Sequence, residues 1–164
     1  MSGSARPPLS LKGRALRLLA AREHSRAELE RKLHGDEVSP EALTRLLDEL
    51  QALGYLNEQR VAESLLYRRA PRLGLTRLKQ ELQHKGLDAD TVQAALEPLR
   101  ASELERAREV WRKKFGQPPQ DSAERARQMR FLAGRGFGGA VIRQVVSGTD
   151  PEDASWDDAG HGAD

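Results

Sequence analysis

Cysteine is absent from this chain of 164 residues. Without thiols there are neither disulfides nor thiolate metal sites, which is typical of a protein in a reducing compartment. Long apolar runs are absent too, since no stretch approaches the roughly 20 apolar residues of a membrane span. The first residues also lack the apolar stretch of a signal peptide. We therefore expect a cytoplasmic protein without a membrane partner.

Aromatic residues are scarce, at 4% of the chain, so few large side chains are available to anchor a single deep core. This scarcity favours an extended or segmented architecture. Leucine and alanine are abundant whereas β-branched residues are few, which favours helices over strands. The composition predicts an all-α fold.

Charged residues make up 32% of the chain, and their signs are unevenly distributed. The formal net charge is +2, but residues 149–164 contain six acidic side chains and no Lys or Arg. The rest of the chain therefore holds 27 basic and 19 acidic residues, a formal charge of +8. Such a body is expected to attract phosphate backbones or an acidic protein surface. The alternative is that these charges only solvate helix faces.

Helix start and stop signals divide the chain into nine expected helices. The first is expected to begin near residue 11, and the others to cover 27–33, 40–53, 58–69, 76–85, 89–99, 103–115, 122–133 and 139–146. Residues suited to N-capping precede several of them: Ser25 with Glu28, Ser39, Asn57, Asp88, and Ser102 with Glu105.

The helical pattern repeats along the chain. A shift of 49 residues places Leu29 on Leu78, and a shift of 50 places Gly86 on Gly136, with apolar positions and turns in register. Stacked units of this kind are expected to form an elongated, curved body. We expect a flexible segment at 1–10, three-helix repeats at 11–56, 57–100 and 101–148, and an acidic, disordered tail at 149–164.

Residue patterns of catalysis are missing. The histidines, His24, His34, His84 and His161, have no metal-ligand spacing and are expected to be polar surface residues. The stretch GRGFGG lacks the preceding strand and the following Gly-Lys-Ser/Thr of a phosphate loop. No pair of carboxylates has a pattern typical of general acid–base catalysis. We expect a protein that is not an enzyme and that uses no metal or cofactor.

Basic residues gather in the second and third of the expected repeats. Between Glu63 and Asp88 there are six Lys or Arg but only one acidic residue, Glu81, whereas a surface that only confers solubility would mix the signs more evenly. The alternative is that Glu81 lies in an i, i+4 row with its basic neighbours, which merely solvates the helix. The residues expected to contact a partner or DNA are Arg68, Arg69, Arg72, Arg77, Lys79, Lys85, Arg127, Arg130 and Arg135.

The few aromatic residues are expected to serve packing rather than base stacking. Trp111 and Phe115 lie four apart on one helix and are expected in the core. Tyr55 follows a helix-ending glycine and is expected to cover, or seal, the core of the first repeat. Trp156 stands among the acidic residues of the tail, which either docks on a basic groove, including one of this chain, or is an inert end.

Four stretches carry a family resemblance, in this order between residues 12 and 147: ALRLLAAREHSRAELERKL, LGYLNEQRVAESLLYRRA, RLGLTRLKQELQHKGLD and RFLAGRGFGGAVIRQVV. They resemble the RecX family, bacterial regulators of the recombinase RecA. The more specific parts are GYLNEQRVAES and RGF, because leucine spacing alone is common to many helical proteins.

The resemblance implies three tandem three-helix repeats and no enzymatic activity. It also implies binding along the helical groove of a RecA–DNA filament, which hinders filament growth, ATP hydrolysis and strand exchange and so modulates recombination and DNA repair. Some relatives also bind DNA directly, and we expect a monomer. The first repeat has Asp36 and Glu37 where the second repeat has Lys85 and Gly86, so equal roles for the repeats are not expected.

Two other functions are open at this point. Residues 25–56 are also similar to the helical part of a winged-helix DNA-binding domain, whose second helix enters the major groove. A wing of two short strands should follow, yet the next segment, NEQRVAESLLYRR, has a helical pattern. A general helical scaffold that binds proteins through leucine faces is the other alternative, and it predicts little dependence on salt.

Overall fold

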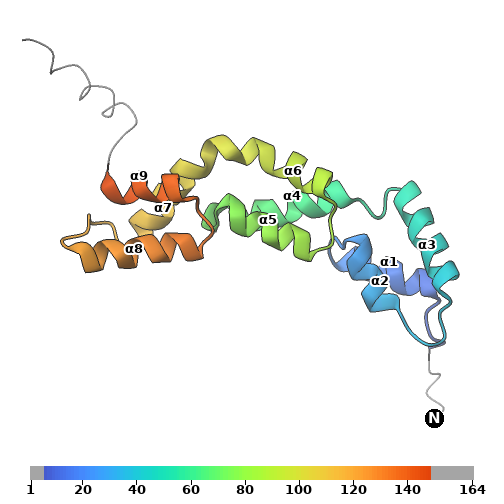
Figure 1. Ribbon diagram of the computed structural model, residues 1–164. Helices are drawn as coiled ribbons and strands as arrows, with labels where there is room; N and C mark the ends of the chain where they lie inside the picture. The colour runs from blue at the N-terminus through green and yellow to red at the C-terminus, as the bar shows by residue number, and fades with distance from the viewer. Residues whose placement is uncertain (1–5, 149–164) are drawn as a thin grey trace, which may run out of the picture. The chain divides into compact units, whose positions relative to one another are not determined.

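The computed structural model describes residues 6–148, and within this range every element of regular secondary structure is a helix. The α-helices are α1 Leu11–Ala21, α2 Arg26–Leu33, α3 Pro40–Ala52, α4 Glu58–Arg69, α5 Leu75–His84, α6 Ala89–Leu96, α7 Glu103–Lys114, α8 Ser122–Gly134 and α9 Gly139–Ser147 (Figure 1). Two 3-10 helices, η1 Ala70–Arg72 and η2 Glu97–Ser102, follow α4 and α6. The all-α prediction is confirmed. Residues 1–5 of the expected flexible segment and the expected acidic tail lie outside the described residues.

The helical segment after α3 removes the winged-helix alternative. A wing would require two short strands at this place, but α4 begins at Glu58 and no strand occurs in residues 6–148. Helices α1–α3, α4–α6 and α7–α9 are called the first, second and third repeats below.

By their contacts, the described residues form two compact units. Unit 1 comprises residues 6–66 and 81–95, and unit 2 comprises residues 67–80 and 96–148. The second repeat therefore contributes to both units, because α4 and α5 each have residues in unit 1 and in unit 2.

The core of unit 1 is built from leucines on the inner faces of α1, α2 and α3. Their spacing of three and four residues brings them to one side of each helix. Leu29 and Leu50 are fully buried, and burial of one such side chain contributes about 2 kcal/mol. The buried members of this core are Ala15, Leu29, Leu33, Leu43, Leu46, Leu47, Leu50 and Leu56.

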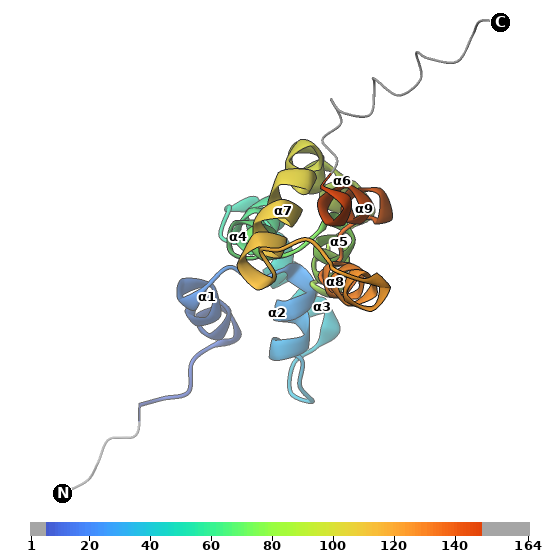
Figure 2. The same ribbon diagram turned by 90° about the vertical axis from the view of Figure 1, so that its left-hand side faces the viewer.

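The core of unit 2 lies where α7, α8 and α9 meet (Figure 2). Its buried members are Ala107, Leu132, Phe137, Ile142, Val145 and Val146. Trp111 packs against them, and its indole Nε1 donates a hydrogen bond to Oε1 of the buried Gln128 at 2.8 Å. The amide of Gln128 donates in turn to the carbonyl of Gln117. The prediction for Trp111 is confirmed in that its side chain packs, partly buried, against this core, whereas Phe115, predicted with it, is not among the side chains of this core. The buried amide of Gln128 beside Trp111 has hydrogen-bond partners within the protein.

Most of the predicted N-caps are present. Ser25 and Glu28 form the reciprocal capping box of α2, and Ser39 accepts from the backbone N–H of Ala42 at 3.1 Å. The side chains of Asn57 and Asp88 cap α4 and α6 in the same way. These caps satisfy N–H groups that a helix start leaves without intrahelical partners.

The predicted capping box of Ser102 and Glu105 is wrong. Ser102 has helical dihedral angles and no capping hydrogen bond, because η2 connects α6 to α7 without an open helix start. The Ser102 hydroxyl instead donates to the carbonyl of Leu99 and accepts from Arg106, while Glu105 pairs with Arg108.

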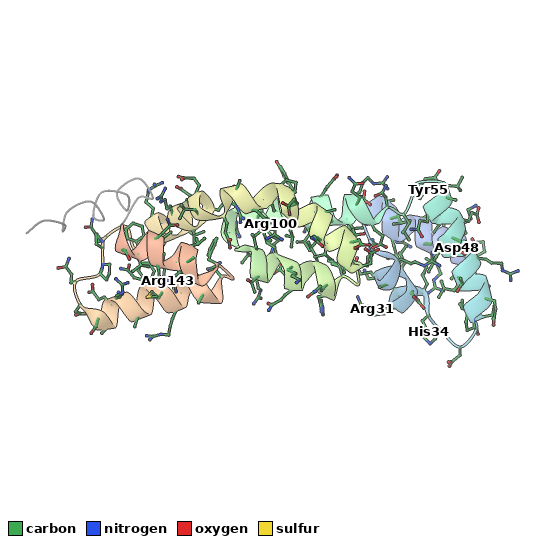
Figure 3. The ribbon with its side chains drawn as sticks, turned by 45° about the horizontal axis from the view of Figure 1, so that its top comes forward. Arg31, His34, Asp48, Tyr55, Arg100 and Arg143 are labelled. Carbon is green, nitrogen blue, oxygen red and sulfur yellow. The ribbon has the colours of Figure 1, made fainter. Side chains whose placement is uncertain are left out.

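Two further expectations about side-chain placement are wrong. Tyr55 does not seal the first repeat: it is 54% exposed (Figure 3), and the neighbouring Leu56 fills the core in its place. His24 is not a surface residue, since it is 1% exposed. Its Nδ1 lies 3.0 Å from the carbonyl oxygen of Arg22 and its Nε2 lies 2.9 Å from Nζ of Lys32, so both ring nitrogens have partners within the protein.

Candidate functional site

In unit 1 the start of α2 packs against the turn between α5 and α6. Gly86 has a φ of +81°, and a Cβ at this residue would lie 2.5 Å from the Cβ of Ala27. The hydroxyl of Ser25 donates to the carbonyl oxygen of Lys85, and the backbone N–H of Arg26 donates to Glu58 at 2.8 Å. We call this set of contacts the first joint, because it connects the first repeat to the second.

Glu28 forms the electrostatic centre of the first joint. Its buried carboxylate accepts hydrogen bonds from Nζ of Lys85 at 2.7 Å, from the backbone N–H of Ser25 at 2.8 Å and from Arg22 at 3.1 Å. Burial alone would raise the pKa of Glu28, but these three donors outweigh it and lower the pKa to about 2. Glu28 is therefore ionised at neutral pH, and Lys85 neutralises it.

In unit 2 the residues that precede α5 pack against the turn between α8 and α9, and we call these contacts the second joint. A Cβ at Gly74 would collide with the peptide between Gly136 and Phe137. The backbone N–H of Gly74 donates to the carbonyl of Arg135 at 2.8 Å, and that of Thr76 donates to Gly136 at 3.2 Å. Close backbone approach of this kind requires glycine.

The two joints use equivalent positions. Ser25 corresponds to Gly74 by the shift of 49 residues, and Lys85 corresponds to Arg135 by the shift of 50. In both joints the carbonyl of the second residue accepts a hydrogen bond from the first. The glutamate at the start of the next repeat's first helix also recurs, because Glu103 accepts from the backbone N–H of Leu75 as Glu58 accepts from Arg26.

The second joint places Arg135 at a cleft of about 670 Å³ in unit 2. Residues from the end of α4, from η1, from α7 and from the end of α8 line it. Five basic side chains and one acidic side chain face it, so its formal charge is strongly positive. We call it the basic cleft, and its lining residues are Arg68, Pro71, Arg72, Glu109, Val110, Lys113, Lys114, Phe131 and Arg135.

Aromatic rings support the cations on one side of the basic cleft. The guanidinium of Arg135 lies 5.1 Å from the ring centroid of Phe131, and Nζ of Lys114 lies 5.5 Å from it. Phe131 meets Phe115 edge to face, with centroids 5.4 Å apart. Such cation–π contacts contribute about 0.5–1 kcal/mol at exposed sites. They hold the charged groups near the cleft rather than leaving them extended into solvent.

The wall made by η1 is fixed by Arg106 of α7. Its guanidinium donates to the backbone carbonyls of Ala70, Leu73 and Leu99, so it links η1 and η2 to α7. Burial lowers the pKa of Arg106, while the nearby Glu103 opposes this shift. An arginine stays protonated under such conditions, and its role here is to satisfy carbonyl groups that the short 3-10 helices leave open.

The structure brings together three of the nine residues that the sequence predicted as a contact set, namely Arg68, Arg72 and Arg135. Lys85 lies in the first joint, and Arg127 stacks on the ring of Phe115, 5.9 Å from its centroid. The remaining predicted residues lie on α4, α5 and α8 outside the lining of the cleft: Arg69, Arg77, Lys79 and Arg130.

Sequence reasoning missed Lys113 and Lys114, which line the basic cleft. The run Arg112, Lys113, Lys114 at the end of a predicted helix was a visible signal. Tyr67, which directly precedes Arg68 on α4, was not singled out either; it is 87% exposed and lies outside the lining of the cleft. A fully exposed tyrosine beside arginines is a composition typical of protein contact surfaces.

The cleft is equipped to bind anions. Guanidinium groups bind phosphate and carboxylate oxygens in a bidentate way, and lysine adds point charge. In the part of the chain that the structure describes, no group of three or more His, Asp or Glu side chains is arranged to hold a metal ion. Among the same residues, no helix is long and apolar enough to span a bilayer.

The two joints and the recurring turn glycines define a protein built of tandem three-helix repeats. Comparison with known families gives the same division: RecX models for the first, second and third three-helix domains match residues 12–50, 57–96 and 101–146. The chain belongs to the RecX family. The resemblance seen in the sequence is thereby confirmed.

Individual relatives agree with this assignment. The chain is 56% identical over 149 residues to the protein named Regulatory protein RecX of Leptothrix cholodnii, covering 91% of this chain and 95% of the relative. It is 48% identical to the protein of the same name from Ralstonia nicotianae over 145 residues, covering 88% and 91%. The crystal structure of RecX from Lactobacillus salivarius has a TM-score of 0.73 at 19% identity, covering 84% of this chain and 93% of that one, and shares its fold.

Proposed function

We propose that this protein is a non-enzymatic regulator of RecA that acts in the cytoplasm and binds the groove of the RecA–DNA filament. Binding inhibits ATP hydrolysis, filament growth and strand exchange, and so modulates recombination and DNA repair. The observation that carries the proposal is the basic cleft of unit 2, in a chain whose three repeats all match the RecX family.

The cleft suggests how the protein engages a filament that contains both DNA and protein. Arg68, Arg72 and Arg135 would pair with phosphate oxygens or with carboxylates, and Lys113 and Lys114 would add attraction at longer range. DNA is reached directly or through the filament. A protein bound to successive subunits restricts the motions between them that ATP turnover needs.

The other predicted contact residues keep a place in the proposal as flanking charges. Arg69, Arg77, Lys79, Arg127 and Arg130 add to the positive field around the cleft. Lys85 contributes less to the binding of a partner, because its ammonium group already neutralises the buried Glu28.

DNA-stimulated ATP hydrolysis by RecA, titrated with this protein, tests the proposal. The test variant is Arg72→Glu with Lys113→Glu, two exposed residues of the cleft. The matched control is Arg31→Glu with Arg45→Glu, which makes the same charge change at exposed positions of unit 1. Circular dichroism and urea unfolding establish that both variants fold.

We expect the unchanged protein and the control to inhibit hydrolysis, and the cleft variant to need at least about tenfold more protein for half inhibition, a loss of about 1.4 kcal/mol. Inhibition should weaken between about 50 and 200 mM salt, as for phosphate contacts. Inhibition far below one molecule per RecA subunit indicates blocking of filament ends, whereas stoichiometric inhibition indicates lining of the groove. No inhibition by the unchanged protein would refute the proposal and favour a general scaffold.

A further inference from the structure

The sequence that follows α9 has the opposite charge to the basic cleft. Residues 149–164 contain six acidic side chains, no Lys or Arg, and one large aromatic, Trp156. The cleft presents five basic side chains and one acidic side chain, and Pro71, Val110 and Phe131 add apolar surface to its lining. An acidic segment with one indole ring is therefore complementary to the cleft in both charge and polarity.

The place where this segment leaves the described fold lies beside the same helix. Gly148, directly after α9, lines a hollow of about 330 Å³ together with Arg108 and Arg112 of α7. The cleft uses Glu109 and Lys113, the next residues along α7. Gly148, the last described residue before the acidic segment, and the basic cleft thus both lie beside α7 within unit 2.

The segment is long enough to reach the cleft. Helix α7 has 12 residues and so is about 18 Å long. Residues 149–164 would span up to about 53–58 Å when extended, and about 20–24 Å as a flexible coil. A tether of this length gives the segment a local concentration on the order of millimolar near the cleft. At such a local concentration even weak ion pairs would be enough for the segment to compete for the cleft at low salt.

We propose that the acidic segment 149–164 binds the basic cleft of its own chain, so that a polyanionic partner must displace it. The carboxylates pair with Arg68, Arg72 and Lys113, and the indole ring of Trp156 lies against the apolar part of the lining. The segment lowers the affinity of the cleft for weak or nonspecific anions, whereas a partner with many phosphates or carboxylates displaces it.

Quenching of Trp156 fluorescence by acrylamide tests the contact in the full chain. The emission of Trp156 is obtained by subtracting the spectrum of Trp156→Phe, which retains Trp111 as the other tryptophan. At about 20 mM salt we expect a quenching constant at least about twofold lower than at about 500 mM, because salt screens the ion pairs. In Arg72→Glu with Lys113→Glu the low-salt protection should be lost, and in Arg31→Glu with Arg45→Glu it should remain.

A second measurement tests the competition. We would neutralise the segment by Asp150→Asn, Asp153→Asn, Asp157→Asn and Asp158→Asn, and titrate a fluorescein-labelled single-stranded oligonucleotide as the probe. Neutralisation should tighten binding about three- to tenfold in the unchanged cleft and by less than twofold in the Arg72→Glu, Lys113→Glu background. Equal tightening in both backgrounds would show that net charge alone acts, and it would overturn the proposal.

Equal quenching constants in all variants and at both salt concentrations would also overturn it. Neither measurement contains RecA. A failure here therefore leaves the regulatory function standing, and a failure of RecA inhibition leaves the contact between segment and cleft to be decided by these two measurements.

Discussion

Nζ of Lys85 lies 2.7 Å from Oε1 of Glu28, a residue 57 positions earlier in the sequence. The carboxylate is 8% exposed and the ammonium group belongs to a side chain that is 24% exposed, so the pair is shielded from water on the carboxylate side. The contact connects the first turn of α2 to the residue directly after α5. It makes the fit between the first and second repeats depend on charge as well as on leucine packing.

Loss of either partner should destabilise unit 1. Glu28→Gln keeps an acceptor for the backbone N–H of Ser25 but loses the charge that Lys85 and Arg22 bind, and we expect a loss of about 2 kcal/mol. Lys85→Met should cost a similar amount, because it leaves the buried carboxylate with one cation fewer. Urea unfolding of both single variants and the double variant measures the coupling, which we expect at about 1 kcal/mol or more. Additive losses would contradict an interaction between the two side chains.

The same carboxylate makes stability depend on pH. Its pKa is about 2 in the folded protein and 4.5 in the absence of its partners, so the unfolded chain binds the proton more readily. The stabilisation is therefore complete above pH 4.5 and is lost as the pH falls towards 2. Allowing for screening by solvent, the amount is about 2 kcal/mol. The gap in unfolding free energy between the unchanged protein and Glu28→Gln should stay constant from pH 6 to about pH 4.5 and narrow as the pH falls further to 3. A gap that stays constant down to pH 3 would contradict this account.

Glycine at the second joint should be far less replaceable than glycine at an open turn. Gly136 and Gly54 both have positive φ, +87° and +81°, but only Gly136 would place a Cβ against the backbone of Arg77, while nothing lies near Gly54. Gly54→Ala should cost about 1 kcal/mol for the strained dihedral, and Gly136→Ala about 3 kcal/mol because the joint must also open. The urea midpoints of the two variants measure these losses. Equal losses of stability would mean that the close approach of Gly136 to Arg77 does not contribute to stability.

The helices could be predicted because their signals are local. The side chains of Asn57 and Asp88 accept hydrogen bonds from backbone N–H groups three residues later, so each signal is complete within one turn. Ser102 shows the limit of such reasoning, because the pattern Ser-x-x-Glu also occurs where the preceding segment is already helical. Whether a serine caps a helix then depends on the conformation of residues before it, which the pattern does not contain.

The joints and the basic cleft could be predicted only in part, since they depend on contacts between distant residues. A shift of 49 or 50 residues identified the turn glycines, but it did not indicate that Lys85 would meet Glu28 instead of continuing a solvent row with Glu81. Lys113 lines the cleft because α7 packs against η1 and α8, and these contacts join residues that are distant in the sequence. Repetition in the sequence predicts what the repeats share, whereas the cleft arises from residues that differ between them.

The buried histidine gives a second prediction about pH. Burial lowers the pKa of His24, and the carbonyl of Arg22 only partly opposes this, while the charges of Arg22 and Lys32 lower it further. The neutral ring donates from Nδ1 to Arg22 and accepts at Nε2 from Lys32. Because the folded pKa lies below 6.5, the stabilisation is complete above pH 6.5 and is lost as the pH falls below it.

His24→Asn provides the comparison, because its amide can still donate to the carbonyl of Arg22 but does not titrate. The unchanged protein should lose more unfolding free energy than this variant between pH 7.5 and pH 5, in urea titrations at constant ionic strength. Direct NMR titration of the imidazole should give a midpoint below 6.5. A midpoint above 6.5 would contradict the neutral, buried ring.

Glu58 should respond to neutralisation in the opposite way to Glu28, although both lie in the first joint. Burial raises the pKa of Glu58; the backbone N–H of Arg26 opposes the shift, and the carboxylate of Asp88 adds to it. A raised carboxyl pKa means that the protonated form fits the folded state better. Its contribution to stability is complete below pH 4.5 and is lost as the pH rises through the folded pKa.

At pH 7 the ionised Glu58 therefore costs stability that an uncharged acceptor would not. Glu58→Gln retains a carbonyl oxygen for the N–H of Arg26, so it should raise the urea midpoint at pH 7 and leave it unchanged near pH 3.5. Glu58→Ala removes the acceptor from the start of α2 and should cost about 1 kcal/mol near pH 3.5. It should cost less at pH 7, because there it also removes the unfavourable charge. If Glu58→Gln destabilised the protein at pH 7 as much as Glu58→Ala, the charge itself would be holding the helix start, and the burial of Glu58 would not be the dominant effect at this joint.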